Sequence, residues 1–366
     1  MAYDRLAALE VRIDDVDHQR LERETSSDFT RVTTEIALTG PSSGSDTSAG
    51  TDDGTVTGLG EDVTYDGDEH DAIAETGLPT GKLEGAFTLE SFSERLSEVD
   101  LFPAGSPDRD DFRDYRRWAF ESAALDLALR QAGTTMADVV EHERSPVRFV
   151  ASTRLGDPPT LERIDHLRRI VPDVELKLDP TSDWTDDVID GLAATDAVRI
   201  LDLKGQYEGT DVDAPGDPAL YRRLADAFPN AVLEDPAVTP ETRPVLEDEG
   251  VRERLSWDAP IHGVADIEAL PWEPRWLNVK PSRFGSLETL LETLEYCTEA
   301  GIMCYGGGQF ELGVGRGQIQ LLASLFYPDS PNDVAPRAYN EPTVGEELPT
   351  SPLDPDNAEG SSGFRW

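Results

Sequence analysis

Acidic and basic side chains recur at positions that a repeated strand–helix pattern would bring together. Each of them ends or follows a short apolar segment, and successive segments start about 20–30 residues apart. These residues are Lys177, Asp202, Lys204, Glu234, Asp258 and Lys280. A step of that size corresponds to one strand and one helix, so the side chains would meet at the C-terminal mouth of a parallel barrel.

Three converging carboxylates favour a divalent cation. Asp202, Glu234 and Asp258 would supply the hard oxygen ligands that Mg²⁺, or alternatively Mn²⁺, prefers, and without a cation they would repel one another. An amine opposite them, at Lys280, could act as a general base. The combined chemistry is abstraction of a proton α to a carboxylate, with the metal stabilising the enediolate oxygens.

Lysine is rare in this chain, so the positions of the few lysines are informative. The 366 residues carry a net charge of −42, and only four of the 32 basic residues are lysines. Three of the four are Lys177, Lys204 and Lys280, so each is expected to have a specific role. A purely structural reading stays open, in which the acidic residues cap helices or pair with arginine and the lysines form ion pairs.

Composition excludes several classes of function. The acidic surface disfavours nucleic acid and anionic membranes, which need basic partners. No run of about 18 apolar residues could span a bilayer, and the first residues lack a basic-then-apolar signal sequence. Two cysteines, Cys297 and Cys304, indicate no disulfide framework. We expect a cytoplasmic protein of the halophilic type, acting on a small-molecule carboxylate.

Apolar segments alternate with helical patterns from residue 146 onward. The expected strands are 148–152, 174–179, 198–204, 231–236, 254–258, 276–280 and 301–307. The expected helices are 160–170, 185–194, 217–227, 240–250, 263–269, 286–299 and 316–326. Seven such units without a Gly-rich dinucleotide fingerprint favour a closed barrel over an open sheet. We therefore predict an α/β fold, a TIM-like (β/α)7β barrel.

The first part of the chain has a different rhythm. Its expected strands are 6–16, 29–38 and 56–65, its expected helices are 88–98 and 110–132, and the Gly/Ser/Asp-rich segment 40–55 is an expected loop. This order predicts an α+β capping domain. The predicted boundaries are 1–143 for the capping domain and 144–330 for the barrel, with 331–366 packing back on the capping domain.

Several motifs resemble the enolase superfamily, in the branch of mandelate racemase and muconate lactonising enzyme. The resemblance covers nearly the whole chain. It is carried by Gly58-Leu-Gly60-Glu61, by the helix WAFESAALDLALRQAG, by LEDP at 233–236, by NVKPSRFGSLETLLE at 278–292 and by GGQFELGVG at 307–315. It implies a barrel with a capping domain, a bound Mg²⁺ and a symmetric homo-oligomer.

The resemblance also implies residue roles. Asp202, Glu234 and Asp258 match the metal ligands, and Lys280 matches the base. Lys177 would neutralise the substrate carboxylate or assist as an acid. Further residues near the expected mouth are weaker candidates for substrate contact, and they are Asp179, Tyr305, Gln309 and Glu311.

Two motifs depart from the pattern of that superfamily. Its strand-2 K-x-K is here Lys177-Leu-Asp179, and its strand-3 D-x-N is here Asp202-Leu-Lys204. Lys204 could supply the missing ammonium from a new direction, or it could form a salt bridge with Asp179.

One clear base with an unusual partner favours a dehydratase or other lyase, with a racemase or epimerase beside it. The alternatives are a muconate-type cycloisomerase and a non-catalytic barrel that acts as a binding or scaffold protein.

Overall fold

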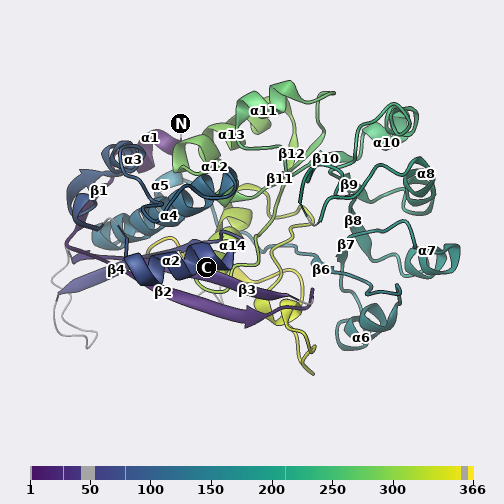
Figure 1. The fold of residues 1–366 in the computed structure, drawn as a ribbon, viewed down its shortest axis with the longest axis horizontal. Helices are drawn as coiled ribbons and strands as arrows, with labels where there is room; N and C mark the ends of the chain where they lie inside the picture. Colours follow the sequence, from purple (N-terminus) through teal and green to yellow (C-terminus); the bar gives the residue numbers. More distant parts are fainter. Residues whose placement is uncertain (1, 28, 43–53, 79, 211, 356–361) are drawn as a thin grey trace.

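The computed structural model describes residues 2–27, 29–42, 54–78, 80–210, 212–355 and 362–366. An antiparallel sheet from the N-terminal region packs beside a parallel sheet built by the second half of the chain (Figure 1). Most of the predicted loop 40–55, residues 43–53, lies outside the described residues. None of the described helices is long and apolar enough to cross a bilayer.

The second half of the chain forms a seven-stranded parallel sheet in which each strand pairs with the next in sequence. Its strands are β6 (Ala151–Thr153), β7 (Leu176–Leu178), β8 (Val198–Asp202), β9 (Val232–Glu234), β10 (Leu255–Trp257), β11 (Trp276–Val279) and β12 (Met303–Gly306). The helices are α6 (Glu162–Ile170), α7 (Asp186–Ala193), α8 (Pro218–Ala227), α9 (Arg243–Leu246), α10 (Glu249–Arg252), α11 (Val264–Ala269), α12 (Pro281–Phe284), α13 (Leu287–Ala300) and α14 (Gly315–Phe326). Each predicted strand is present, whereas the predicted helix 240–250 is divided into α9 and α10.

A short extended segment joins the two edges of this sheet. The amide of Val150, just before β6, donates to the carbonyl of Asn332 at 2.8 Å. The amide of Asp333 donates to the carbonyl of Gly306 in β12 at 2.7 Å. Residues 332 and 333 therefore occupy the eighth position of the barrel, and the predicted (β/α)7β fold class is confirmed.

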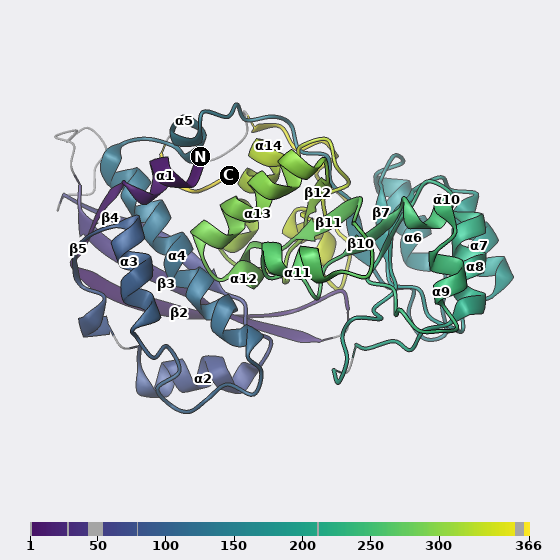
Figure 2. The ribbon, with the colours of Figure 1, turned by 90° about the horizontal axis from the view of Figure 1, so that it is seen from above.

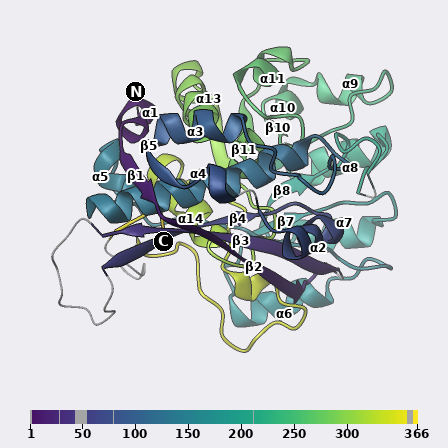
Figure 3. The ribbon, with the colours of Figure 1, turned by 60° about the vertical axis from the view of Figure 1, so that its left-hand side comes forward.

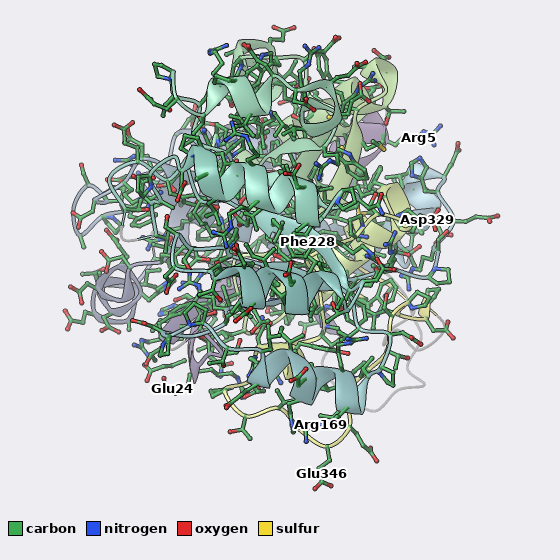
Figure 4. The ribbon with its side chains drawn as sticks, turned by 90° about the vertical axis from the view of Figure 1, so that its right-hand side faces the viewer. Arg5, Glu24, Arg169, Phe228, Asp329 and Glu346 are labelled. Atoms are coloured by element: carbon green, nitrogen blue, oxygen red, sulfur yellow. The ribbon has the colours of Figure 1, made fainter. Side chains whose placement is uncertain are left out.

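Side chains alternate along the barrel strands between two separate apolar clusters. Leu201 and Leu233 belong to the main core, whereas their neighbours Ile200 and Val232 form a second cluster with Tyr305. Because successive side chains of a strand point to opposite faces, the second cluster is the filling of the barrel interior. The outer helices cover the other face (Figure 4), where Phe228 at the end of α8 is buried while Arg169 and Glu346 reach solvent.

The N-terminal region combines strands and helices, as the predicted capping domain requires. Its elements are α1 (Ala2–Ala7), β1 (Glu10–Ile13), β2 (Asp15–Glu24), β3 (Thr30–Pro41), β4 (Thr55–Asp62), α2 (Gly67–Thr76), η1 (Thr80–Lys82), β5 (Gly85–Thr88), α3 (Leu89–Ser97), α4 (Asp111–Ala132) and α5 (Met136–Val140). Strands β2, β3 and β4 form one antiparallel sheet, and β1 pairs with β5. In Figure 2 these elements lie at one end of the molecule and helices α6–α10 at the other.

The predicted strand 6–16 is wrong at its start. Residues 2–7 form α1, whose Leu6 and Ala7 are buried, and the strand begins at Glu10. Ala and Leu are strong helix formers, and α1 packs on α5 and α13. The segment is too short for its sequence pattern to distinguish a helix from a strand, and this packing favours the helix.

Two glycines bring β4 close to α4, which lies along the sheet (Figure 3). A Cβ at Gly60 would stand 2.0 Å from the carbonyl oxygen of Ala119, and one at Gly58 would stand 2.3 Å from that of Ala123. Only glycine permits this approach, and the small alanines of α4 meet it from the other side. The close packing fixes Glu61, the next residue, against the barrel.

The last described residues pack on the capping region. Phe364 is buried against Trp118, with ring centroids 6.3 Å apart, and its amide donates to Asp126 at 2.8 Å. Earlier in the same segment, Leu353 exchanges two backbone hydrogen bonds with Val147, near β6. The segment beyond η2 (Arg337–Asn340) thus contacts both halves of the chain.

Candidate active site

The C-terminal ends of five consecutive barrel strands carry the predicted site residues. Lys177 lies in β7, Asp202 ends β8 and Glu234 ends β9. Asp258 directly follows β10, and Lys280 directly follows β11. The three carboxylates have 0% exposure, and the two lysines are also buried. The five side chains therefore meet at one end of the barrel.

Each carboxylate of this group faces a lysine. The Lys177 ammonium lies 2.6 Å from Glu234 Oε1 and 3.4 Å from Asp202 Oδ2. The Lys280 ammonium donates to Asp258 Oδ2 at 2.8 Å. The contacts of Lys177 with Glu234 and of Lys280 with Asp258 are charge-assisted hydrogen bonds, which are stronger than bonds between neutral groups.

Lys204 lies near Asp179, as one of its two predicted roles requires, and it also contacts Asp202. Its ammonium hydrogen-bonds Asp202 Oδ2 and lies 3.8 Å from Asp179 Oδ1. Asp179 is held from its other side by Arg154, 3.1 Å away. The lysine that replaces the expected asparagine is therefore tied both to a predicted metal ligand and to the altered strand-2 position.

Glu234 is the most heavily hydrogen-bonded of the three carboxylates. The Tyr305 hydroxyl donates to its Oε2, and the Asn278 amide lies 3.3 Å from both of its oxygens. Tyr305 also contacts the Ser256 hydroxyl at 3.0 Å. Tyr305 is fully buried, so it positions Glu234 inside the barrel and does not line the cavity.

Asp258 has one crowded oxygen and one bare oxygen. Its Oδ2 accepts from Lys280 and, at 2.8 Å, from the Tyr207 hydroxyl, and Arg283 lies 3.4 Å away. Its Oδ1 is buried and has no hydrogen-bond partner among the described residues. The Asp258 amide donates to Asp235 Oδ1 at 2.8 Å, which fixes the backbone at this position.

The electrostatics of the group follow from burial and from which cation is nearest. Burial raises the pKa of Glu234 to about 8, and the neighbouring Asp202 and Asp258 add to this rise against the pull of Lys177. Burial alone would also raise the pKa of Asp202, but Lys204 and Lys177 hold it below its ordinary value. The lysines near Glu234 therefore compensate only part of the negative charge of the three carboxylates.

A cavity of about 510 Å³ opens above this group. Its charged lining is mostly basic, in contrast to the chain as a whole, and consists of Arg109, Arg154, Lys177, Lys204, Lys280 and Arg283 against Asp179 and Asp333. The carboxylates of Asp202, Glu234 and Asp258 do not line it. The three lysines thus separate the buried acidic group from the open space.

The N-terminal region and one barrel loop complete the walls of the cavity. Phe29, from the connection between β2 and β3, meets Phe310 edge to face, with ring centroids 5.3 Å apart. Tyr65, Tyr115 and Gln309 also line the space, whereas Glu311 does not. The cavity is therefore lined by aromatic side chains as well as by the ammonium groups of the three lysines.

Glu61 holds the loop that contributes Gln309 and Phe310. Its carboxylate accepts from the backbone amides of Leu312 at 2.6 Å and of Gly315 at 2.9 Å. The Gly58-Leu-Gly60-Glu61 segment lies within strand β4, and its Glu61 connects the capping region to the barrel. Glu311 faces inward in the same loop, where it accepts from the Gln309 amide at 2.7 Å.

Comparison with known families divides the chain into two matched regions. Residues 143–341 match the C-terminal domain of a family described as a domain of unknown function, DUF8230, and residues 4–139 match its N-terminal domain. The chain belongs to the DUF8230 family. A search of curated proteins found no match to the sequence.

Solved structures show which fold this DUF8230 protein has. Muconate lactonizing enzyme from Pseudomonas putida superimposes with a TM-score of 0.61 at 16% identity, covering 88% of each chain. An enolase superfamily member from Listeria innocua gives a TM-score of 0.63 at 17% identity, covering 91% of this chain and 88% of that one. The resemblance to the enolase superfamily is thus confirmed at the level of the fold.

The donor set of the DUF8230 protein fits a hard divalent cation in its chemistry. Three carboxylates end or directly follow successive strands, the bare Asp258 Oδ1 is an unused ligand atom, and the negative charge around Glu234 is only partly compensated. In the conformation described, however, the described residues contain no group of three or more Asp, Glu, His or Cys side chains that is arranged to hold a metal ion. The ammonium groups on these carboxylates would have to give way first.

Several residues around the carboxylates of the DUF8230 protein were not among the predicted site residues. Tyr207 and Arg283 reach Asp258, Asn278 reaches Glu234, and Asp333 lies 3.4 Å from Lys177. Asn278 could have been found from its place two residues before Lys280 on the same face of β11. Tyr207 lies in the long connection after β8, where no periodic pattern indicates which side chain turns inward.

Proposed function

We propose that this protein is a Mg²⁺-dependent enzyme that removes a proton α to the carboxylate of a small organic acid. The observation that carries the proposal is the placement of lysine. Three of the four lysines in a chain of net charge −42 line one cavity at the mouth of the barrel. Chance placement on an acidic surface would not gather them over three buried carboxylates.

An anionic substrate fits the charge of this cavity. Arg154, Lys204 and Lys280 line it, while the acidic ligands lie below. A carboxylate entering from the capping side would reach ammonium groups, and the aromatic rings of Phe29 and Tyr207 would exclude water around it. A volume of about 510 Å³ suits a small organic acid.

Lys280 is the proposed base. Its amine lies at the boundary between the cavity and Asp258, so it can face a substrate carbon on one side while Asp258 orients it on the other. Positioned proton transfer of this kind contributes about 10²–10⁴-fold to a rate. Lys177, from the strand on the opposite side of the barrel, would neutralise the carboxylate or return a proton.

Asp202, Glu234 and Asp258 are the residues that would hold the cation. When bound, Mg²⁺ supplies the positive charge that stabilises an enediolate. Tyr305 and Asn278 keep Glu234 fixed for this role, and Asp235 fixes the backbone of Asp258. Among reactions that share the enediolate, we favour β-elimination of water, with racemisation or epimerisation as the second candidate because Lys204 brings a further ammonium to the cavity.

Hydrogen exchange with solvent tests the proposal without knowledge of the product. The purified protein with MgCl₂ would be incubated in D₂O with a library of small carboxylic acids, and deuterium at the α-carbon followed by NMR and mass spectrometry. For an acid that exchanges or reacts, Lys280→Ala should lower the rate by about 10²–10⁴-fold.

Lys82→Ala is the matched control, because Lys82 is the remaining lysine and is exposed in the capping region. Exchange that survives in Lys280→Ala would remove this lysine from the role of base. No exchange or reaction of any acid by the wild type would favour a non-catalytic barrel.

A further inference from the structure

Lys204 lies on Asp202, one of the carboxylates proposed to hold the cation. Its ammonium is hydrogen-bonded to Asp202 Oδ2, and Lys177 approaches the same oxygen at 3.4 Å. Asp202 itself has no exposed surface and does not reach the cavity, whereas Lys204 lines it. An ion entering from the cavity would therefore meet the Lys204 ammonium before it met the carboxylate.

The backbone around Lys204 shows that this placement is specific. Lys204 has φ of 55°, in the left-handed region that is uncommon for a lysine. Its amide donates to Asp202 Oδ1 at 3.3 Å, so backbone and side chain both turn toward the same carboxylate. The two bonds keep the side chain folded back onto its own strand end.

A second anion lies within reach of the same ammonium. Asp179 Oδ1 is 3.8 Å away, and the Tyr207 ring centroid is 5.1 Å away. Both groups line the cavity, and Arg154 keeps Asp179 in place. The ammonium can leave Asp202 by a small shift and still remain paired.

We propose that Lys204 is a built-in counter-ion that competes with the divalent cation for Asp202 and moves to Asp179 when the cation binds. The inference rests on the proposed function, because it takes Asp202 as a ligand of that cation. In the resting protein the ammonium neutralises a buried carboxylate that would otherwise be costly to leave unpaired. The same contact weakens the affinity of Asp202 for the cation. When the Lys204 ammonium leaves Asp202, its positive charge turns toward the cavity.

Titration with Mn²⁺ alone tests this competition in the full-length protein. Free Mn²⁺ would be measured by electron paramagnetic resonance at fixed KCl concentration, after removal of bound metal with EDTA. Lys204→Asn should lower the dissociation constant for Mn²⁺ by about tenfold or more, since it removes the competing charge. Asparagine also accepts a positive φ, so the backbone can keep its conformation.

Two further variants control for charge and for folding. Lys82→Asn makes the same change in net charge at an exposed site and should leave the dissociation constant unchanged. Lys204→Arg keeps a positive charge beside Asp202 and should bind Mn²⁺ as weakly as the wild type. In EDTA, Lys204→Asn should melt at a lower temperature than the wild type, and added Mn²⁺ should restore it.

The outcomes separate this inference from the proposed function. Equal Mn²⁺ affinity in wild type and Lys204→Asn would overturn the inference alone, as would a lower melting temperature that Mn²⁺ does not restore. Tighter binding by Lys82→Asn as well would reduce the effect to overall charge and would also overturn it. No Mn²⁺ binding by either protein would overturn the inference together with the metal-dependent part of the function, while α-deuterium exchange would still test Lys280.

Discussion

Removal of the Lys177 ammonium is the sharpest test of the buried charge group. Its nitrogen lies 2.6 Å from Glu234, 3.4 Å from Asp202 and 3.4 Å from Asp333, and its side chain is 3% exposed. Lys177→Met keeps the length of the side chain and removes the charge. Breaking a buried ion pair by removal of one partner costs about 3–5 kcal/mol, because it leaves an uncompensated charge. We expect a loss of that size in the free energy of unfolding at pH 9.

The loss should depend on pH in a defined direction. The pKa of Glu234 is raised to about 8 in the folded protein, so the folded state holds this proton more tightly than the unfolded chain does. The stability that this proton provides is complete below the ordinary glutamate pKa and is lost as the pH rises through 8. Without Lys177, Glu234 keeps its proton to higher pH, so the deficit of the variant should be smaller at pH 6 than at pH 9.

Urea unfolding followed by tryptophan fluorescence measures both quantities, with Trp184 and Trp257 as buried reporters. The double variant Lys177→Met/Glu234→Gln should regain part of the loss at pH 9, because the unpaired carboxylate is gone. A deficit below about 1 kcal/mol at pH 9, or one of equal size at pH 6, would refute the reasoning, since an interaction that weak is typical of exposed pairs.

Two further changes test how the capping region is held. Arg116→Met removes the buried partner of Asp62, 2.8 Å away, and should cost about 3–5 kcal/mol in urea unfolding at pH 7. Burial would raise the pKa of Asp62, but Arg116 and His70 lower it, so this stabilisation should disappear in the wild type as the pH falls below about 4; a variant with unchanged acid sensitivity would contradict this account. Glu61→Ala leaves the amides of Leu312, Gly313 and Gly315 without their acceptor and should cost at least about 2 kcal/mol. Hydrogen–deuterium exchange should speed up at those amides, and unaltered protection there would show that another group holds the loop.

Much of the fold could be predicted from local patterns. The apolar face of 110–132 and the following Gly133 predicted α4, which ends with Gly133 in the left-handed conformation at φ of 65°. Each barrel strand could be located because short apolar runs alternate with helical segments. Helix α2 could not, since only His70 and Ile73 of its ten residues are buried, which leaves no apolar period to read.

The candidate site, like the fold, contains residues that could be predicted from the sequence and residues that could not. Lys177, Asp202, Glu234, Asp258 and Lys280 could be placed together because strand spacing fixes which ends of a parallel barrel meet. Of their hydrogen-bond partners, Asn278 could be found from the alternation of side chains along β11, whereas Tyr207 could not, because it lies in a long connection without a periodic pattern.

Lys204 shows why the spacing of residues in the sequence cannot predict which side chains contact one another within the site. The sequence left open whether its ammonium replaces the missing strand-2 lysine or pairs with Asp179. Its position depends on a positive φ and on the side-chain direction, and in the structure it lies near Asp179 and also contacts Asp202.

The scarcity of lysine makes this protein suited to spectroscopy. Incorporation of lysine labelled only at ¹⁵Nζ or ¹³Cε would yield four side-chain resonances, of which three arise from the barrel mouth and one from Lys82 at the exterior. In a chain of 40.1 kDa, ligand binding, proton exchange and ion binding could each be followed at individual lysines. The resonance of the exposed Lys82 would serve as an internal reference in the same spectrum.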